Sequence, residues 1–173
     1  TMGLLSQSRF FSMQSRVYWL MFAAAILRIC CLSFTQTVDA DAVSRVFMSW
    51  VWMEKMEFIA QGVWLPFHQY LLGIGFWLWP DLVFTPKLIN LLIFTICVWP
   101  FYKFCSMLFG EKTAWLPTII FMLSPALLRN GFMAMAGVPY ISFVILAMYF
   151  AQKTAESGKQ KHARLAGVFI TIA

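Results

Sequence analysis

Apolar residues in this 173-residue chain are gathered into long runs that short polar stretches separate. A helix rises about 1.5 Å per residue and the hydrocarbon core of a bilayer is about 30 Å thick, so about 20 apolar residues can cross it. The runs predict four membrane-spanning helices, the third of them short, and the start of a fifth. They cover residues 17–37, 87–109, 113–128, 131–151 and 165–173. The last run stops short of a full span, so we read residues 1–173 as the N-terminal part of a longer transmembrane domain.

The long connection over residues 38–86 has apolar stretches of its own. Its first half repeats apolar residues at helical spacing, which gives one apolar face; they are Val43, Val46, Phe47, Trp50 and Val51. Its second half is rich in tryptophan and phenylalanine, which concentrate where a membrane meets water. We therefore expect two helices that lie along the membrane surface, over residues 40–60 and 66–79.

Composition supports a membrane protein. Hydrophobic residues make up 61% of the chain and charged residues 12%, with a mean hydropathy of +0.75. A typical water-soluble domain has about twice that share of charged residues. The predicted fold class is all-α, a polytopic transmembrane helix bundle with interfacial helices in the first external loop.

Basic residues set the expected orientation, because cytosolic loops of membrane proteins hold an excess of lysine and arginine. A cytosolic N-terminus places most of them on or near the cytosolic side and leaves the 38–86 connection, which is mainly acidic, outside. The basic residues concerned are Arg9, Arg16, Lys103, Lys112, Lys153, Lys159, Lys161 and Arg164. This distribution is typical of membrane topology and of contact with membrane lipids, and it does not indicate a nucleic-acid partner.

Several catalytic motifs are absent from the sequence. It has no Walker loop, GxGxxG or HExxH motif and no serine nucleophile elbow, so nucleotide-driven and hydrolase functions have no support. The cysteines lie in or at the ends of apolar runs without CxxC spacing, so neither a disulfide framework nor a metal knuckle is indicated. They are Cys30, Cys31, Cys97 and Cys105.

Two carboxylates, Asp39 and Asp41, follow the first apolar run directly. In one interpretation Asp39 caps the helix that follows, while Asp41 lies in its first turn and pairs with Arg45 four residues later. In the other, one carboxylate takes a proton from an incoming hydroxyl, or both bind a divalent cation. The pair is therefore the candidate catalytic site, and it is also a candidate site for a divalent cation.

Three further positions could bind an anionic ligand. Arg28 lies deep in the first predicted span, where it either extends to the outer head groups or faces a cavity and holds a phosphate. His68 is either a polar tip in an interfacial helix or a ligand for phosphate or metal. Arg129 and Asn130 separate the third and fourth spans, either as a turn or as contacts to the same anion.

The order of these motifs resembles the N-terminal half of the GT-C membrane glycosyltransferases. The branch in question includes bacterial relatives of protein mannosyltransferases and lipopolysaccharide-modifying sugar transferases. The matching pieces are Arg28, Asp39-Ala-Asp-Ala-Val-Ser-Arg45, Gly62-Val-Trp-Leu-Pro-Phe-His-Gln-Tyr-Leu-Leu-Gly73, Thr85-Pro-Lys-Leu-Ile-Asn-Leu-Leu92, Leu123-Ser-Pro125 and Ala134-Met-Ala-Gly-Val-Pro-Tyr140. They extend over nearly the whole chain.

The resemblance implies an enzyme of the bacterial inner membrane that moves a sugar from a polyprenyl-phosphate donor to an acceptor on the periplasmic or lumenal face. Asp39 or Asp41 would be the catalytic residue, as general base or cation ligand. A donor site near Arg28, His68 or Arg129 follows from the same resemblance, with Arg45 and Asn130 as further candidate contacts.

One departure from the family pattern supports an alternative function. Many relatives have an acidic residue just before the Val/Ile-Pro of the fourth span, whereas this chain has Gly137. The alternative is a non-catalytic structural or accessory subunit of a membrane protein complex with the same fold. A transporter of lipid-linked sugar is a third possibility, but the sequence has no clear inverted repeat to support it.

Overall fold

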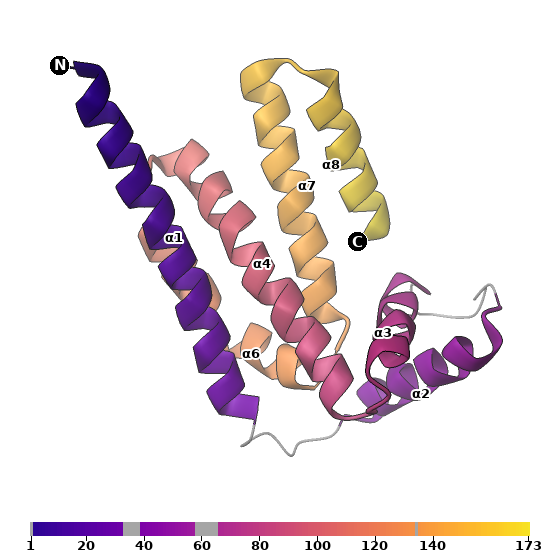
Figure 1. The fold of residues 1–173 in the computed structure, drawn as a ribbon. Coiled ribbons are helices and arrows are strands. Elements are labelled where there is room, and N and C mark those ends of the chain that lie inside the picture. Colours follow the sequence, from indigo (N-terminus) through magenta and orange to yellow (C-terminus); the bar gives the residue numbers. More distant parts are fainter. Residues whose placement is uncertain (1, 33–38, 58–65, 134) are drawn as a thin grey trace.

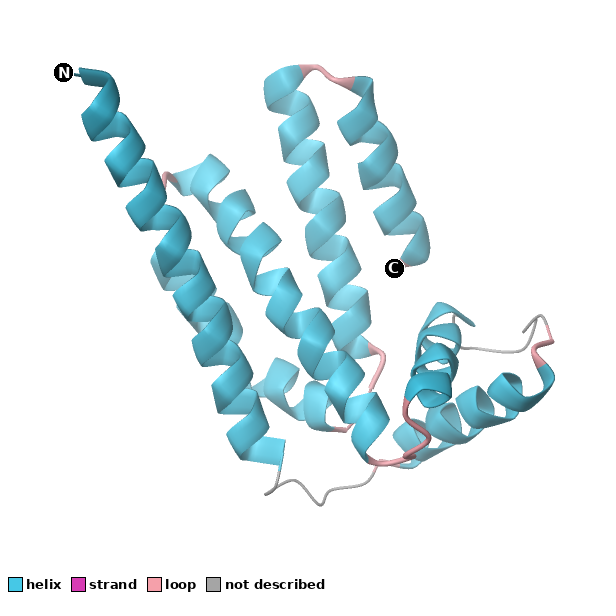
Figure 2. Ribbon diagram, in the orientation of Figure 1, coloured by secondary structure: helices cyan, strands magenta, loops and turns pink. Residues whose placement is uncertain are grey.

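The computed structural model describes residues 2–32, 39–57, 66–133 and 135–173. All regular structure in these residues is helical, as Figure 2 shows, which confirms the predicted all-α class. The helices are α1 (Met2–Leu32), α2 (Ala40–Lys55), α3 (Pro66–Leu78), α4 (Phe84–Phe109), α5 (Trp115–Met122), α6 (Pro125–Phe132), α7 (Gly137–Ser157) and α8 (Gln160–Ile172).

Helices α1, α4, α7 and α8 run side by side, and α4 packs against both α1 and α7 (Figure 1). Helices α2 and α3 form a separate pair at the end of this group where α1 finishes and α4 begins. The N-terminus and the turn between α7 and α8 lie at the opposite end. The two ends of the bundle therefore differ in structure as well as in charge.

Helix α4 is the central element of the bundle. In the described part of the chain it is the one helix long and apolar enough to cross a membrane, judged by length and composition. The apolar segment Val17–Leu32 of α1 is shorter.

The carboxylate of Asp81 lies at the start of α4. It accepts hydrogen bonds from the backbone N–H groups of Val83 and Phe84 at 2.8 and 2.7 Å, and these bonds lower the pKa of its carboxyl group. The first backbone N–H groups of a helix have no acceptor within the helix, and Asp81 supplies one here.

Apolar side chains from several helices form the core. Phe94 and Val98 of α4 are fully buried and pack with Ala24 of α1, Met122 of α5 and Val138 of α7. Phe94 also stacks on Phe121, with ring centroids 5.0 Å apart. Close packing of this kind adds many small van der Waals attractions between the helices. The core therefore joins α4 to α1, α5 and α7.

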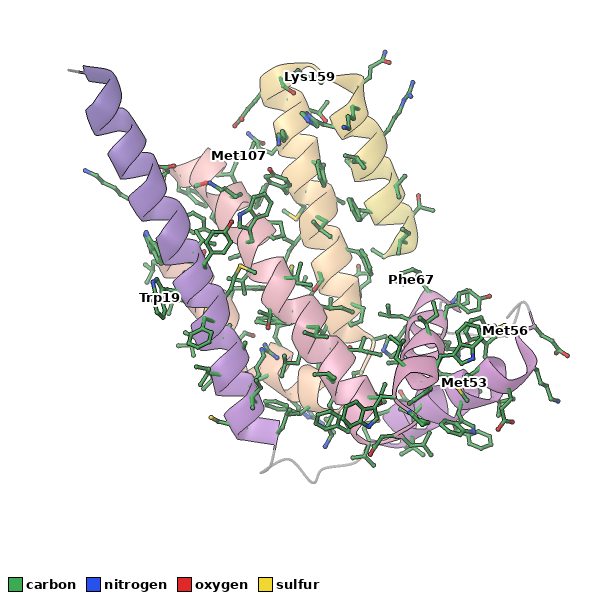
Figure 3. All side chains as sticks on the ribbon, viewed as in Figure 1. Trp19, Met53, Met56, Phe67, Met107 and Lys159 are labelled. Atoms are coloured by element: carbon green, nitrogen blue, oxygen red, sulfur yellow. The ribbon has the colours of Figure 1, made fainter. Side chains whose placement is uncertain are left out.

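The outward faces of the bundle are also apolar. Trp19, Phe22 and Ile29 of α1 and Ile96 of α4 are each more than half exposed. Figure 3 shows Trp19 on the face of α1 that points away from the bundle. A surface of this composition fits a hydrocarbon environment better than water.

The region predicted as one span over residues 113–128 is divided in the structure. Helix α5 ends at Met122, and α6 starts at Pro125. Proline lacks an N–H group and disfavours helical dihedrals in the residue before it, and Ser124 adopts φ −55° and ψ 117°. Since α6 takes up residues 125–132, α7 starts at Gly137, later than the predicted 131.

The two helices expected in the 38–86 connection are present as α2 and α3. Residues 58–65, which include the end of the first predicted helix, lie outside the described residues. The two helices pack closely because Gly73 has no side chain: a Cβ there would overlap the ring of Trp52. Trp52 also contacts Tyr70, with centroids 5.0 Å apart, and Trp50 contacts Phe76 at 5.5 Å.

Candidate functional site

A cavity of about 300 Å³ lies where α2, α3, α7 and the last residues of α8 meet. Its polar side chains come from Arg45 of α2, His68 of α3 and Tyr140 of α7. Most of the remaining wall is apolar and includes Phe67 and Phe143. In Figure 3, Phe67 marks the end of α3 that is nearest to the C-terminus of α8. A concave apolar site with a few convergent polar groups is the usual form of a ligand site.

His68 is the buried polar group of this cavity. It is 4% exposed, and neither of its ring nitrogens has a hydrogen-bond partner among the described residues. Burial, together with the positive charge of Arg45, lowers its pKa to about 4. The ring is therefore neutral at pH 7 and presents one N–H donor and one acceptor nitrogen. Polar groups buried in proteins nearly always have partners, so this ring fits a site whose partner is a ligand.

Arg45 supplies the positive charge of the cavity. It lies in the middle of α2, where its backbone carbonyl accepts a hydrogen bond from the hydroxyl of Ser49 at 2.7 Å. Burial lowers the pKa of Arg45, and the charge of Asp41 one turn earlier partly offsets the effect. Arginine stays protonated under all ordinary conditions, so the cavity has a positive field.

Aromatic rings connect the helices that form the cavity. Phe67 of α3 meets Phe143 of α7 edge to face, with ring centroids 5.1 Å apart. Phe143 in turn stacks near Phe169 of α8 at 6.2 Å. Tyr140 is about half exposed at 54%. The arrangement can hold a group that is anionic at one point and has flat or apolar faces elsewhere.

The two carboxylates of the predicted catalytic pair lie at the start of α2. Asp39 is the N-cap, and its Oδ1 accepts the N–H of Asp41 at 2.9 Å, which confirms the capping role. Asp41 is exposed in the first turn. Neither residue is part of the cavity wall, although Asp41 is on the same helix as Arg45 and interacts with its charge. Among the described residues, no group of three or more potential ligands surrounds the pair to complete a metal site.

Arg28 lies in the core and not at the cavity. Its guanidinium stacks on the ring of Phe94, 3.4 Å from the centroid, and the residue is 1% exposed. Of the two interpretations of Arg28, the one in which it extends to the outer head groups is therefore wrong. Within the described part of the chain, its Nε and Nη2 atoms have no hydrogen-bond partner. It packs so closely on Gly131 that a Cβ there would lie 2.8 Å from Nη1.

Arg129 and Asn130 are also outside the cavity wall, on the short helix α6. Arg129 is exposed, while Asn130 packs against the cavity residue Gly137. A Cβ on Gly137 would lie 2.9 Å from Nδ2 of Asn130. The amide of Asn130 thus occupies the space beside the position where many members of the resembled family have an acidic residue. Of the predicted substrate-binding residues, the structure joins Arg45 and His68 and separates Arg28, Arg129 and Asn130 from them.

Sequence patterns did not identify every residue of this region. Tyr140 entered the sequence analysis only as the last residue of a matching motif and Phe143 did not enter it; only their spacing of three on one helix face could have indicated a shared site. Gln69 next to His68 is 2% exposed; it donates to the sulfur of Met48 at 3.4 Å, and its Oε1 has no partner among the described residues. In the sequence, the available signal for this buried site was the pair of adjacent polar residues, His68 and Gln69, within an apolar helix.

Comparisons with known proteins add no family assignment. A scan against protein-family models gives no match, and searches of curated proteins and of solved structures also give none.

Proposed function

We propose that this chain is part of a multi-pass membrane glycosyltransferase that moves a sugar from a polyprenyl-phosphate donor to an acceptor on the non-cytosolic side. The observation that supports this most strongly is the cavity, which combines a guanidinium, aromatic walls and a buried imidazole that has no hydrogen-bond partner within the described part of the chain. A lipid-linked sugar has matching parts, namely an anionic phosphate and a sugar ring with flat faces. The GT-C resemblance of the motif order points to the same class.

The arrangement of the helices fits this role. In the proposed topology α1, α4, the α5–α6 pair and α7 pass through the membrane, and α2 and α3 lie at its non-cytosolic surface. The α2–α3 end of the molecule is rich in exposed apolar residues, among them Trp77 at 64%, Trp79 at 56% and Val83 at 66%. The basic residues of the α7–α8 turn are at the opposite end. Aromatic residues at one boundary and basic residues at the other follow the pattern of an oriented membrane protein.

The chemistry requires a base near the donor. In the proposed reaction, an oxygen of the acceptor hydroxyl attacks the anomeric carbon of the sugar, and a carboxylate of the Asp39–Asp41 pair takes the hydroxyl proton. The bond from the anomeric carbon to the phosphate oxygen breaks, and the bonding electrons leave with polyprenyl phosphate. A positively charged cavity stabilises the negative charge that develops on this leaving group.

Substitution of the carboxylates tests the proposal. In the full-length protein reconstituted in liposomes with polyprenyl-phosphate-linked mannose, glucose or arabinose and a hydroxyl-bearing acceptor lipid or peptide, we expect wild type to transfer sugar to the acceptor and release polyprenyl phosphate from at least one donor. Asp39→Asn or Asp41→Asn should lower transfer by roughly 100-fold or more, because general-base catalysis contributes about that much. Asparagine caps a helix as well as aspartate does, so Asp39→Asn should leave the thermal unfolding temperature unchanged.

A matched control separates capping from catalysis. Asp39→Ser keeps a capping oxygen without a carboxylate, whereas Asp39→Ala removes both and should destabilise the protein by about 1 kcal/mol. Full transfer by both asparagine variants would reject the catalytic assignment. Absence of transfer by wild type with every donor would favour the accessory-subunit alternative, which Gly137 supports.

A further inference from the structure

The start of α7 supplies much of the cavity wall. The lining residues in this part of the chain are Ala136, Gly137, Pro139 and Tyr140. A helix start is often fixed by a side chain that caps its first N–H groups. Ala136 occupies the N-cap position of α7 and has no side-chain group that could do this. The position of this wall therefore depends on contacts with other elements.

Met135, the residue before the N-cap, is held at both of its backbone polar groups. Its N–H donates to the backbone carbonyl of Asn130 in α6 at 3.1 Å. Its carbonyl accepts a hydrogen bond from the side-chain amide of Asn90 in α4, also at 3.1 Å. Hydrogen bonds from two neighbouring helices therefore fix the point at which α7 starts.

Asn90 is a polar residue in an apolar interior. Its side chain is fully buried, and its Oδ1 has no hydrogen-bond partner among the described residues. Burial of an amide in this state has a free-energy cost that an apolar side chain of similar size would not have. We therefore expect Asn90 to contribute little to stability, and its bond to Met135 is the contact through which it can act on the cavity.

We propose that Asn90 is a positioning residue for the cavity. It is not among the lining residues, and it acts through the carbonyl of Met135 to set the place of Ala136, Gly137 and Tyr140. Loss of the amide would leave this carbonyl without its donor and let the start of α7 shift relative to α3. The effect on the wall is independent of the proposed function, whereas the effect on sugar transfer rests on it.

Cysteine labelling tests the position of the wall without any substrate. Ala136→Cys is made in the full-length protein in detergent, alone and together with Asn90→Leu, and its reaction with N-ethylmaleimide is followed by mass spectrometry of the modified peptide. Asn90→Leu should raise the reaction rate by roughly two- to tenfold, the usual value of one hydrogen bond. Asn90→Gln keeps an amide donor and should raise the rate less.

Cys97 provides a matched control in the same interface between α4 and α7. Its sulfur lies 3.8 Å from the carbonyl of Ser142. This contact is about 10 Å further along α4 than Asn90, so it is remote from the start of α7. Cys97→Ala should leave the labelling rate at position 136 unchanged. If Asn90→Leu does not fold, Asn90→Ser replaces it with the same expectation, because its side chain is too short to reach Met135.

Sugar transfer in liposomes shows whether this wall serves the reaction. Asn90→Leu should raise the KM for the donor by roughly two- to tenfold and leave kcat unchanged, since it disturbs binding and not the reacting groups. Cys97→Ala should change neither constant. A general weakening of the fold would lower the unfolding temperature and the amount of active protein instead of raising KM.

Each outcome bears on one of the two proposals. An unchanged labelling rate in Asn90→Leu would overturn the positioning role, and transfer by wild type would leave the proposed function intact. A higher labelling rate with an unchanged KM would overturn the link between this wall and the donor. If wild type transfers no sugar, the proposed function fails, and the labelling rate alone decides the role of Asn90.

Discussion

A neutral, buried histidine beside an arginine is costly to maintain in acid. The unfolded chain binds a proton at His68 with the ordinary pKa of 6.5, whereas the folded chain does so only near pH 4. Between these values the proton favours the unfolded state. The same burial that suits His68 to a ligand therefore makes the fold sensitive to low pH.

This imbalance gives a prediction for stability. When the pH falls from 7 to 4.5, His68 should lower the free energy of unfolding by about 2–3 kcal/mol, since each pKa unit is worth about 1.4 kcal/mol. His68→Gln has no such proton uptake, so it should lose correspondingly less stability over the same interval. Thermal unfolding of both proteins in detergent at several pH values measures the difference. Parallel pH profiles would show that the imidazole is protonated in the folded protein.

Some properties of single residues could be predicted from the sequence and others could not. Asp39 was recognisable as a cap because an aspartate directly before an amphipathic segment is a local signal. The burial of His68 depends on the packing of α2, α3, α7 and α8 around it, which no local pattern encodes. Arg28 was recognised as unusual, but its stacking on Phe94 depends on how α1 meets α4.

At the scale of elements, the α2–α3 pair is held together by a glycine and a tryptophan. Gly73 lies on the face of α3 that meets Trp52 of α2. An indole ring is rigid and cannot fold away from an added methyl group, so the helices themselves would have to separate. The glycine beside Asn130 differs, because the contact there is with the end of a flexible side chain.

The two glycines make a matched pair for mutation. Gly73→Ala should destabilise the protein by about 1–3 kcal/mol, the usual cost of overpacking. Gly137→Ala should change stability by less than about 1 kcal/mol, because the Asn130 amide can rotate and alanine reduces the freedom of the unfolded chain. Chemical unfolding of both variants in detergent gives the comparison. Equal costs would mean that the contact between α2 and α3 is looser than described.

Two helices were predicted well from the hydrophobic pattern, because no proline starts a new helix within them. The 87–109 run corresponds to α4, and the periodic 40–60 segment corresponds to α2 as far as the described residues extend. The 113–128 run was predicted as one helix because its apolar composition is uninterrupted. Pro125 was visible in the sequence, but whether a proline kinks a helix or starts a new one depends on the packing around it.

The whole molecule has two ends that should face different compartments. Asp41 and the α2–α3 pair lie at one end, and Lys159 lies in the turn at the other. The proposed topology places position 41 outside the cytosol and position 159 inside it. The positive-inside rule indicated this orientation from the sequence, and the helix arrangement provides the geometry that labelling can test.

Cysteine accessibility measures this orientation. In intact cells, Asp41→Cys should react with a membrane-impermeant maleimide, and Lys159→Cys should react only after the membrane is permeabilised. The wild-type chain is the control for reaction at its own cysteines, of which Cys97 and Cys105 are buried. The reverse labelling pattern would place the cavity on the cytosolic side and exclude a donor site facing outward.

The close contact of Gly73 with Trp52 has a consequence for motion. We expect two helices in such close contact to move together, which would keep Arg45 and His68 at a nearly constant separation. Any change in the width of the cavity is then expected between α3 and α7, where Phe67 contacts Phe143 edge to face. If the proposed function holds, a lipid donor would enter between these two rings, and Arg45 and His68 would already be placed side by side when it arrives.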